Sequence, residues 1–499
     1  MRLLTGPLRQ PRLSGVIDAT LYPALLLLHA RRGAVNAYED LLARKEPSAP
    51  TAGFAATVEE PWLYPFQRHA VTWALAGGRR ALFEDTGLGK TRQELAWADR
   101  VARHAGGRVL LFAPLAVGAQ TVQEAEAVGL DGVVFARSPD AAGTAPIVVT
   151  NYDNLDKWSP DDFAGIVLDE SSILKSFMGS TRAALTAFAS GIPYRLAATA
   201  TPSPNDVEEL GTHAEWLGMG SRVEMLSRFF VNDSSDTGTW VLKGHAIGPF
   251  WDWVASWALS ARLPSDVGPY DDEGYILPPM RLFPCVVMGD LAEGRADGML
   301  FAIGGVSATS IHETKRRSTA ARAAKAAEII AREPGEPWIV WCETQYEADA
   351  VMAMIPGAFE VSGSMPPDTK SSRLLAFADG RPGSILVTKP KIAGFGLNYQ
   401  RCARVLFVGG SYSYEAFYQA VRRCWRFGQT RPVDVHVLMG FSEQVLWQTV
   451  TGKSDRHADM REQMIRASRR SHGRAAMLHT YNPDHAGSLP AWLTPSEEP

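Results

Sequence analysis

Cysteine is scarce in this chain of 499 residues, and its four cysteines are widely spaced. Cys285, Cys342, Cys402 and Cys424 form no C-x-x-C pair, so the spacing typical of a structural zinc site is missing. So few thiols in a long chain also exclude a small secreted scaffold held together by disulfides. We therefore expect free thiols in a reducing compartment, and the cytoplasm is the predicted location.

Long hydrophobic runs and an excess of positive charge are missing as well. No apolar stretch reaches 18 residues, and the leucine run at 25–28 is too short to cross a bilayer, so we expect no membrane contact. The start of the chain lacks the cleavage pattern of a signal peptide. The net charge of −4 gives no overall basicity for nucleic acid, although a local basic groove is compatible with it.

The apolar segments that are present predict an α/β fold. At 46% hydrophobic and 21% charged residues the chain is globular, and its length predicts two or three domains. Short apolar runs bounded by turn residues alternate with helix-like segments in two separate regions, which indicates two tandem parallel-sheet lobes with crossover helices. The predicted strands are 80–83, 108–113, 146–150, 165–168 and 194–198 in the first region, and 338–341, 384–388, 405–408 and 433–438 in the second.

Composition changes suggest where these lobes begin and end. An aromatic-rich stretch breaks the alternation, and we interpret it as a helical insertion and interlobe linker whose aromatics are core. The basic N-terminal arm either contacts DNA or a protein partner or packs on the first lobe, and the C-terminal tail is a second possible partner site. The predicted divisions are 1–55 (arm and linker), 56–215 (first lobe), 216–325 (insertion and linker), 326–450 (second lobe) and 451–499 (arginine-rich helix and tail).

The stretch FEDTGLGKTRQ at 83–93 resembles a phosphate-binding loop between a strand and a helix. Gly87 and Gly89 allow backbone conformations that point successive N–H groups at a phosphate. Lys90 is predicted to reach the β- and γ-phosphates, and the Thr91 hydroxyl to hold Mg²⁺. Glu84 stands where the generic pattern has its first glycine. The alternative is a glycine-rich turn with an ordinary lysine.

Two carboxylates follow the apolar run at 165–168. At the carboxyl edge of a parallel sheet, Asp169 and Glu170 are expected beside the phosphate loop. We predict that Asp169 binds Mg²⁺ and that Glu170 polarises the attacking water, because phosphoryl transfer depends on positioning and charge neutralisation. The alternative is a strand that ends in two surface acids.

Arginines dominate the stretch QAVRRCWRFGQ at 419–429. Arg422, Arg423 and Arg426 have helical spacing, which places Arg423 and Arg426 on one face. Arginines offered to a triphosphate across a domain gap act as arginine fingers. The alternatives are a solvated basic face or a contact with a nucleic-acid backbone.

Taken in order across residues 60–450, these motifs resemble the motors of helicase superfamily two, most closely the Swi/Snf-like DNA-translocating ATPases, in a compact, phage-like form. The family's loop often carries an acid at the position of Glu84, whereas Ser172 departs from the usual Asp-Glu box. The resemblance implies RecA-like lobes, with Gln67 on the base and Gly396 in the nucleotide site. It also implies nucleic-acid contact or coupling by Thr150, Asn151, Thr199, Thr201, Thr388, Asn398 and Gln419.

The predicted function is an ATP- and Mg²⁺-dependent motor that moves along DNA, with Lys90, Glu170, Arg423 and Arg426 as catalytic residues. The family resemblance implies that this DNA is duplex. A strand-separating DNA or RNA helicase is the first alternative. An inactive, nucleotide-gated nucleic-acid-binding module is the second, and the joint presence of these residues argues against it.

Overall fold

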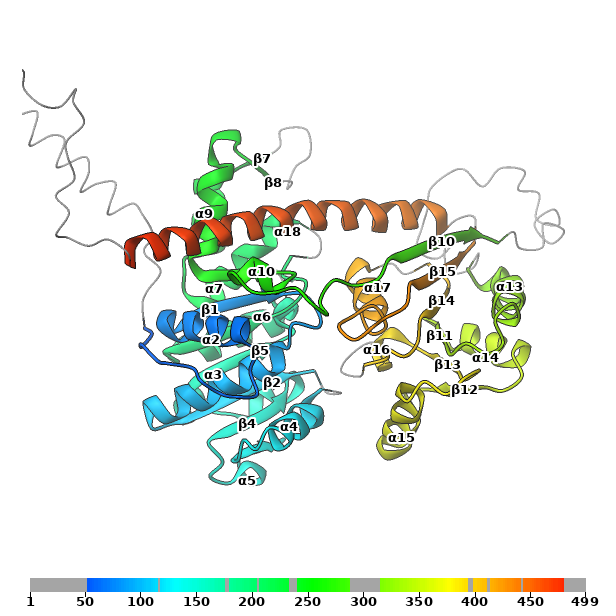
Figure 1. Ribbon diagram of the computed structural model, residues 1–499, viewed down its shortest axis with the longest axis horizontal. Coiled ribbons are helices and arrows are strands. Elements are labelled where there is room, and N and C mark those ends of the chain that lie inside the picture. Colours follow the sequence, from blue (N-terminus) through cyan, green and yellow to red (C-terminus); the bar gives the residue numbers. More distant parts are fainter. Residues whose placement is uncertain are drawn as a thin grey trace, which may run out of the picture. The chain divides into compact units, whose positions relative to one another are not determined.

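The computed structural model describes residues 52–114, 117–175, 179–203, 206–232, 240–287, 315–393, 398–410, 413–440 and 443–479. The predicted arm at 1–55 therefore lies almost entirely outside the described residues, as does the tail beyond residue 479. The described chain forms two separate parallel sheets with helices on both faces, and one short antiparallel pair (Figure 1). This confirms the predicted class of two tandem parallel-sheet α/β lobes.

The first lobe is built on a sheet with the strand order β3-β4-β2-β5-β6-β1-β9. All of its neighbouring strands pair in parallel. Because the carboxyl ends of parallel strands meet at one edge, the loops after β1 and β5 lie at the same edge. Its strands are β1 (Arg79–Glu84), β2 (Arg108–Ala113), β3 (Val133–Phe135), β4 (Ile147–Asn151), β5 (Phe163–Asp169), β6 (Tyr194–Ala198) and β9 (Ala258–Ala261).

Side chains of this sheet alternate between two hydrophobic cores. On β2, Leu110 and Phe112 belong to one core, whereas Val109 and Leu111 belong to the other. This period of two is what a strand buried on both faces requires, and it explains why β2 reads as a continuous apolar run. Helices α2 (Pro65–Gly77), α3 (Lys90–Ala105) and α4 (Gly118–Ala127) cover the face of Val109.

The other face of the first sheet is covered by helices from the second half of this lobe. They supply most of the aromatic residues that the sequence placed in an insertion, and Phe229, Phe250, Trp251 and Trp257 are buried there, as expected of core residues. The helices are α6 (Ser180–Ala189), α7 (Leu210–Leu217), α8 (Arg222–Phe229) and α9 (Ile247–Trp257), with β7 (Phe230–Asn232) and β8 (Trp240–Leu242) as the antiparallel pair. Short helices α5 (Pro139–Ala142) and α10 (Pro264–Val267) complete the lobe.

The second lobe has its own parallel sheet, with the order β10-β15-β14-β11-β13-β12. Helices α13 and α14 cover one face, and α15 and α17 the other. The strands are β10 (Met280–Val286), β11 (Trp338–Trp341), β12 (Ala358–Val361), β13 (Ile385–Thr388), β14 (Arg404–Val408) and β15 (Val433–Met439), and the helices are α13 (Thr319–Ala331), α14 (Gln345–Met354), α15 (Pro367–Ala378), α16 (Pro390–Ala393), α17 (Tyr414–Val421) and α18 (Gln444–His479).

The segment interpreted as an insertion and linker contributes strands to both sheets, which the sequence interpretation missed. β9 pairs with β1 at the edge of the first sheet, and β10 pairs with β15 at the edge of the second. β9 has the sequence ALSA, so it lacks the large β-branched residues that mark a strand. The stretch that connects the lobes is therefore much shorter than 216–325 and runs from Arg262 to Pro279 among the described residues.

Helix α18 joins the cores of both lobes. Trp447, near its start, packs in the core of the second lobe, whereas Met460, Met464 and Ala467 complete a core of the first lobe. The sequence predicted an arginine-rich helix in this region, and the structure extends it to one continuous helix. A single element thus links the two sheets outside the connecting stretch.

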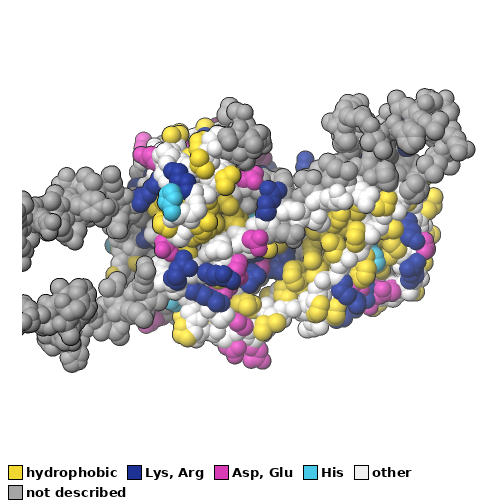
Figure 2. Space-filling model, turned by 90° about the horizontal axis from the view of Figure 1, so that it is seen from above, with side chains coloured by type: hydrophobic (Ala, Val, Ile, Leu, Met, Phe, Trp, Pro, Cys, Tyr) yellow, Lys and Arg dark blue, Asp and Glu magenta, His cyan; other side chains and the backbone are white. Residues whose placement is uncertain are grey.

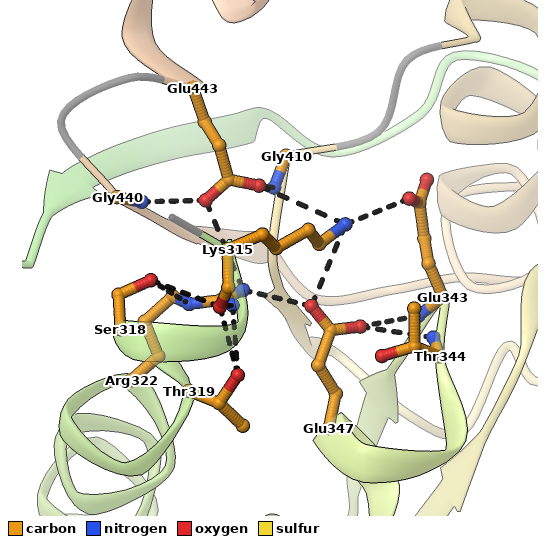
Figure 3. A network of polar contacts seen from close by, with 10 residues as sticks. All are labelled: Lys315, Ser318, Thr319, Arg322, Glu343, Thr344, Glu347, Gly410, Gly440 and Glu443. Atoms are coloured by element: carbon orange, nitrogen blue, oxygen red, sulfur yellow. Dashed lines mark hydrogen bonds and ion pairs between the residues drawn. The ribbon is translucent and has the colours of Figure 1, made fainter. Parts of the chain in front are cut away.

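A buried network of ion pairs fixes the start of α18 to the second lobe (Figure 3). Glu443 accepts hydrogen bonds from the N–H of Gly440 at 2.6 Å and of Gly410 at 3.2 Å. Lys315, which is 1% exposed, has its Nζ 2.9 Å from Glu343 and within 4.0 Å of Glu347 and Glu443. The network also contains Arg322, Ser318, Thr319 and Thr344. It ties the loops after β11, β14 and β15 together.

The outer edge strand of the second sheet, β10, exposes apolar side chains. Leu282, Phe283 and Val286 are 36–42% exposed, and Figure 2 shows hydrophobic side chains gathered over the second lobe on the face that it draws. The backbone groups of Pro279 and Val287 form hydrogen bonds with β15. Because these groups alternate in direction along a strand, the backbone groups of the even-numbered residues, Pro284 included, point away from β15. Because proline has no N–H, it weakens the pairing of another strand at this edge.

Candidate functional site

The loop after β1 has the backbone geometry of a phosphate cradle. Gly87 and Gly89 have φ values of 102° and 81°, in the region that favours glycine. A Cβ at Gly89 would also lie 2.3 Å from Nε2 of Gln67, so a larger residue would have to displace that side chain. Helix α3 begins at Lys90, and its first-turn N–H groups face the same space, as an anion site at a helix N-terminus requires.

Lys90 is held inside this loop by backbone oxygens. Its Nζ donates to the carbonyl of Glu84 at 2.9 Å and to that of Asp85 at 3.3 Å. The Glu84 side chain is fully buried and accepts from Nε2 of Gln93 at 2.6 Å. Burial raises the pKa of Glu84 to about 7, although Lys90 and Gln93 oppose the shift. Glu84 therefore belongs to the packing beneath the loop, and the ammonium group is the part that faces the cavity.

Carboxylates gather opposite Lys90 at the end of β5. Burial, and then the charge of Glu170, raise the pKa of Asp169 to about 7, against the influence of Lys90. Glu94 on α3 is fully buried, and neither of its oxygens has a hydrogen-bond partner. Burial and then Asp169 raise the pKa of Glu94 well above its usual value. No group of three or more His, Cys, Asp or Glu side chains among the described residues is placed to hold a metal ion by itself, but Mg²⁺ needs only one or two carboxylates besides the phosphates of its substrate.

Glu170 has a strained backbone. Its φ of 53° makes it a non-glycine residue in the left-handed region, where a side chain costs about 1–2 kcal/mol. Oγ1 of Thr199 donates to Oε2 of Glu170 at 3.3 Å, and the N–H of Thr201 donates to the Thr199 hydroxyl at 3.1 Å. The chain after β6 is therefore bonded to the predicted water-polarising carboxylate, as a coupling segment would be.

His213 on α7 supports the same turn and was not found from the sequence. Its Nε2 lies 3.1 Å from Oγ of Ser171, and both side chains are fully buried. Burial lowers the pKa of His213 to about 3, so the imidazole is neutral. The Asp-Glu box has Ser172 in place of a histidine, and α7 brings His213 to Ser171, the residue before it. A single buried histidine 42 residues downstream gives no sequence signal for this contact.

The predicted arginines of the second lobe face the same cavity, but not from a helix. Helix α17 ends at Val421, so the expected helical face of Arg423 and Arg426 is wrong. The chain turns there because the carbonyl of Arg423 accepts from the N–H of Tyr399 at 2.8 Å. Gln429 then donates through Nε2 to the carbonyl of Cys402 at 3.1 Å. The turn, rather than a helix, presents the two guanidinium groups.

Arg423 and Arg426 are desolvated. Burial lowers the pKa of Arg423, which Glu170 and Asp169 partly restore. Burial, and then the charge of Arg423, lower the pKa of Arg426 to about 9. The Nη1 of Arg426 donates to Oδ1 of Asn398. Two cations brought together against their mutual repulsion are suited to a strongly anionic ligand.

One cavity of about 330 Å³ collects most of the predicted site residues. It joins the phosphate loop, the end of β5 and the arginine turn, so it has walls from both lobes. The predicted residues that line it are Gln67, Gly87, Gly89, Lys90, Thr91, Asp169, Glu170, Asn398, Arg423 and Arg426. Tyr64, Tyr275 and Phe427 line it as well and were not predicted as ligands.

The other predicted residues that the structure describes do not line this cavity. Thr150, Thr388 and Gln419 are buried, and Oγ1 of Thr388 donates to the carbonyl of Val361 at 2.8 Å. Asn151, at the end of β4, is bonded to the side chain of Asn154. These contacts hold the loops at the carboxyl edges of the two sheets. Gly396 lies outside the described residues.

Asp85 of the phosphate loop is the centre of an ion cluster that the sequence did not reveal. It accepts from the hydroxyl of Tyr418 at 2.6 Å, and its carboxylate lies 2.8 Å from Nη2 of Arg422 and 3.5 Å from Nη2 of Arg461. Burial alone would raise the pKa of Asp85, but the charges of Arg422 and Arg461 hold it well below its usual value. The loop is thus bonded to both α17 and α18. Lys175 and Glu415 form another ion pair between the lobes.

Comparison with known proteins identifies part of this architecture. Residues 321–428 match the family model of the helicase conserved C-terminal domain. This match lies within the second lobe and does not include the first. The match runs from α13 through the arginine turn, and it confirms the helicase resemblance drawn from the motifs.

A solved structure and the curated proteins complete these comparisons. The chain is similar to the Sulfolobus solfataricus SWI2/SNF2 ATPase core in complex with double-stranded DNA, with 18% identity, 82% of this chain and 97% of that chain covered, and a TM-score of 0.38. No curated protein sequence matches the chain. The helicase domain and the two-lobe fold support a helicase-like, nucleic-acid-dependent ATPase. None of the helices in the described residues is long and apolar enough to cross a membrane.

Proposed function

We propose that this protein hydrolyses ATP to ADP and phosphate and uses the energy to move along duplex DNA. The observation that carries the proposal is the cavity whose walls come from both lobes, with Lys90 and Glu170 on one side and Arg423 and Arg426 on the other. A ligand that touches both sides couples its own chemistry to the distance between the lobes. That coupling is what a two-lobed motor requires.

Each residue has a role that its position supports. Lys90 exchanges its two carbonyl partners for β- and γ-phosphate oxygens, while the loop N–H groups bind the remaining charge. Thr91 and Asp169 would hold Mg²⁺, which neutralises developing charge on the phosphates. Glu170 orients and polarises the attacking water from its strained turn. The arginines stabilise the charge that builds up in transfer.

Hydrolysis is coupled to DNA through the loops at the carboxyl edges of the sheets. Thr199 donates to Glu170, and Thr201 donates in turn to Thr199, so a nucleic acid that displaces the segment after β6 also moves this carboxylate. We assign coupling rather than direct contact to the buried Thr150, Thr388 and Gln419. Contact with phosphates rather than base edges predicts binding that is weakly sequence-specific and strongly salt-dependent.

Duplex translocation is favoured over strand separation by the packing of the aromatic segment. A wedge that splits base pairs needs an exposed apolar side chain, and the aromatic Phe229, Phe250 and Trp257 are all core residues. The large apolar side chains that are exposed in this segment are aliphatic, at Val223, Val231, Val241, Ile247 and Ile276. The structure describes 206–232 and 240–287 of this region, so the argument applies to those residues. A forked-duplex unwinding assay and a triplex-displacement assay separate the two activities, and we expect only the second to be positive.

The experiment that tests the proposal is steady-state ATP hydrolysis without nucleic acid and with single-stranded DNA, duplex DNA or RNA. We expect the largest stimulation with duplex DNA. Glu170→Gln should lower the stimulated rate by about 100-fold or more, since a positioned general base contributes 10²–10⁴-fold. Wild-type turnover in Lys90→Ala would refute the site assignment. Stimulation by single strands or RNA alone would instead support an unwinding enzyme.

A further inference from the structure

The cavity is lined by two chemically different kinds of side chain. Lys90, Asp169 and Arg423 are charged groups, whereas Tyr64, Tyr275 and Phe427 are aromatic rings. The centroids of Tyr275 and Phe427 are 4.7 Å apart with planes tilted by 38°, and those of Tyr275 and Tyr64 are 6.4 Å apart, edge to face. An anionic ligand with an apolar, planar group at one end would match both kinds of side chain.

Tyr275 belongs to the stretch between the two sheets and is held in place there. Its N–H donates to the carbonyl of Asp272 at 2.9 Å, and Oδ1 of Asp272 accepts from the N–H of Ser265 at 2.9 Å. Its ring also packs edge to face on Phe66 at 5.5 Å. The phenol is thus a positioned side chain, although no sequence motif includes it.

The tyrosine ring has the properties that stacking on a base requires. It is half-buried, so one part remains available to the cavity, and burial raises its pKa to about 12, so the phenol stays neutral. Gln67 next to it is already engaged: Nε2 donates to the carbonyl of Leu88 at 2.7 Å and Oε1 accepts from the N–H of Tyr64 at 2.9 Å. Among the described residues around Gln67, the aromatic rings therefore offer a base more free surface than the amide of Gln67 does.

We propose that Tyr275 is a specificity-determining residue of the nucleotide site, on whose ring the nucleobase stacks with Phe427 at its side. The inference deepens the proposed ATPase function and rests on it. Tyr275 comes from the connecting stretch and Phe427 from the second lobe, whereas the phosphates are bound by the first lobe. The base would therefore contact the connecting stretch and the second lobe in addition to the contacts that the phosphates make.

The test compares two ligands that share the phosphate end. Binding of ADP and of inorganic tripolyphosphate is measured by titration calorimetry for the wild-type chain and for Tyr275→Ala, Tyr275→Phe and Ile276→Ala. Ile276 is 75% exposed and adjacent, so it is a matched control. Loss of one base–aromatic stack should weaken ADP binding of Tyr275→Ala by about tenfold to a hundredfold. Tyr275→Phe keeps the ring and should bind ADP as the wild type does.

The binding of tripolyphosphate separates the outcomes. Unchanged tripolyphosphate binding by Tyr275→Ala, together with weaker ADP binding, supports a base contact and shows that the site is folded. Equal loss of both ligands would overturn the proposal, because Tyr275 would then only support the loop. Unchanged ADP binding by Tyr275→Ala would overturn it too. If the wild-type chain bound neither ligand, the proposed ATPase function itself would fail.

Discussion

The cluster around Asp85 predicts that one carboxylate of the phosphate loop stabilises the contact between the lobes. Asp85→Asn keeps the shape of the side chain but removes the charge that Arg422 and Arg461 share. Both guanidinium groups are less than 10% exposed, so the variant leaves buried cations without their counter-charge. Breaking a buried pair by removing one partner costs about 3–5 kcal/mol. We expect a loss of that size in the free energy of unfolding at pH 7.

The assay is urea unfolding followed by tryptophan fluorescence, with Asp252→Asn as the control. Asp252 pairs with Arg470 at 2.8 Å, but both side chains are about half exposed, so the control should cost less than about 1 kcal/mol. The double variant Asp85→Asn with Arg461→Met should cost less than the sum of its single changes, since neighbours in one network couple. Equal effects of Asp85→Asn and Asp252→Asn would refute the reasoning.

The pH dependence of this contribution follows from the sign of the shift. The folded pKa of Asp85 lies below that of an unfolded aspartate, which is about 3.9. The stabilisation is therefore fully present above that value and is lost as the pH falls below about 4. The difference in unfolding free energy between wild type and Asp85→Asn should shrink in the same window.

Two further predictions concern the magnesium site and the anchor of α18. Burial raises the pKa of Asp169 to about 7, so its carboxyl group keeps a proton at pH 6 that Mg²⁺ must displace. Calorimetry of Mg·ADP binding in buffers of different ionisation enthalpy measures the protons released. We expect about one proton at pH 6 and almost none at pH 8.5. Lys315→Met leaves the buried Glu347 and Glu443 with less counter-charge and should lower the free energy of unfolding by about 3–5 kcal/mol. The control is Lys325→Met, because Lys325 and its partner Glu328 are 32% and 51% exposed. In the same urea titration this variant should change the free energy of unfolding by less than about 1 kcal/mol.

The sequence predicts those parts of the structure in which local pattern and chemistry agree. The strands at 108–113, 194–198 and 338–341 were predicted with the bounds that the structure gives, because each is apolar on both faces and flanked by turns. The loop with Lys90 and the carboxylates after β5 could be predicted for a similar reason. A glycine-rich loop with a lysine after one strand, together with two acids at the end of another, is a combination typical of a nucleotide site.

What the sequence could not predict depends on long-range contacts. β9 is a strand because β1 offers it an edge, not because ALSA favours one. Arg422 and Arg423 are adjacent, yet one binds Asp85 and the other faces the cavity, because the chain leaves the helix at Val421. Arg461 and Tyr275 belong to no motif, and only the folded chain brings them to the phosphate loop and the nucleotide cavity.

The strain at Glu170 leads to a last prediction, which separates stability from turnover. At an exposed helix position such as Glu328 in α13, a change to Gly should leave the protein about 1 kcal/mol less stable than a change to Ala. At Glu170, with its φ of 53°, the order should be inverted, because glycine adopts this backbone freely and alanine does not.

Measured by urea unfolding, Glu170→Gly should therefore be more stable than Glu170→Ala, by about 1 kcal/mol. Both variants should lose ATP turnover, because neither has the carboxylate bonded to Thr199. If the Ala variant were more stable than the Gly variant at Glu170, as it is expected to be at Glu328, the turn would relax in solution and its strain would have no role. If Glu170→Gly is the more stable variant and neither variant turns over ATP, the site keeps a glutamate that destabilises the fold because the chemistry needs its carboxylate. Stability is often lower at residues that a reaction requires.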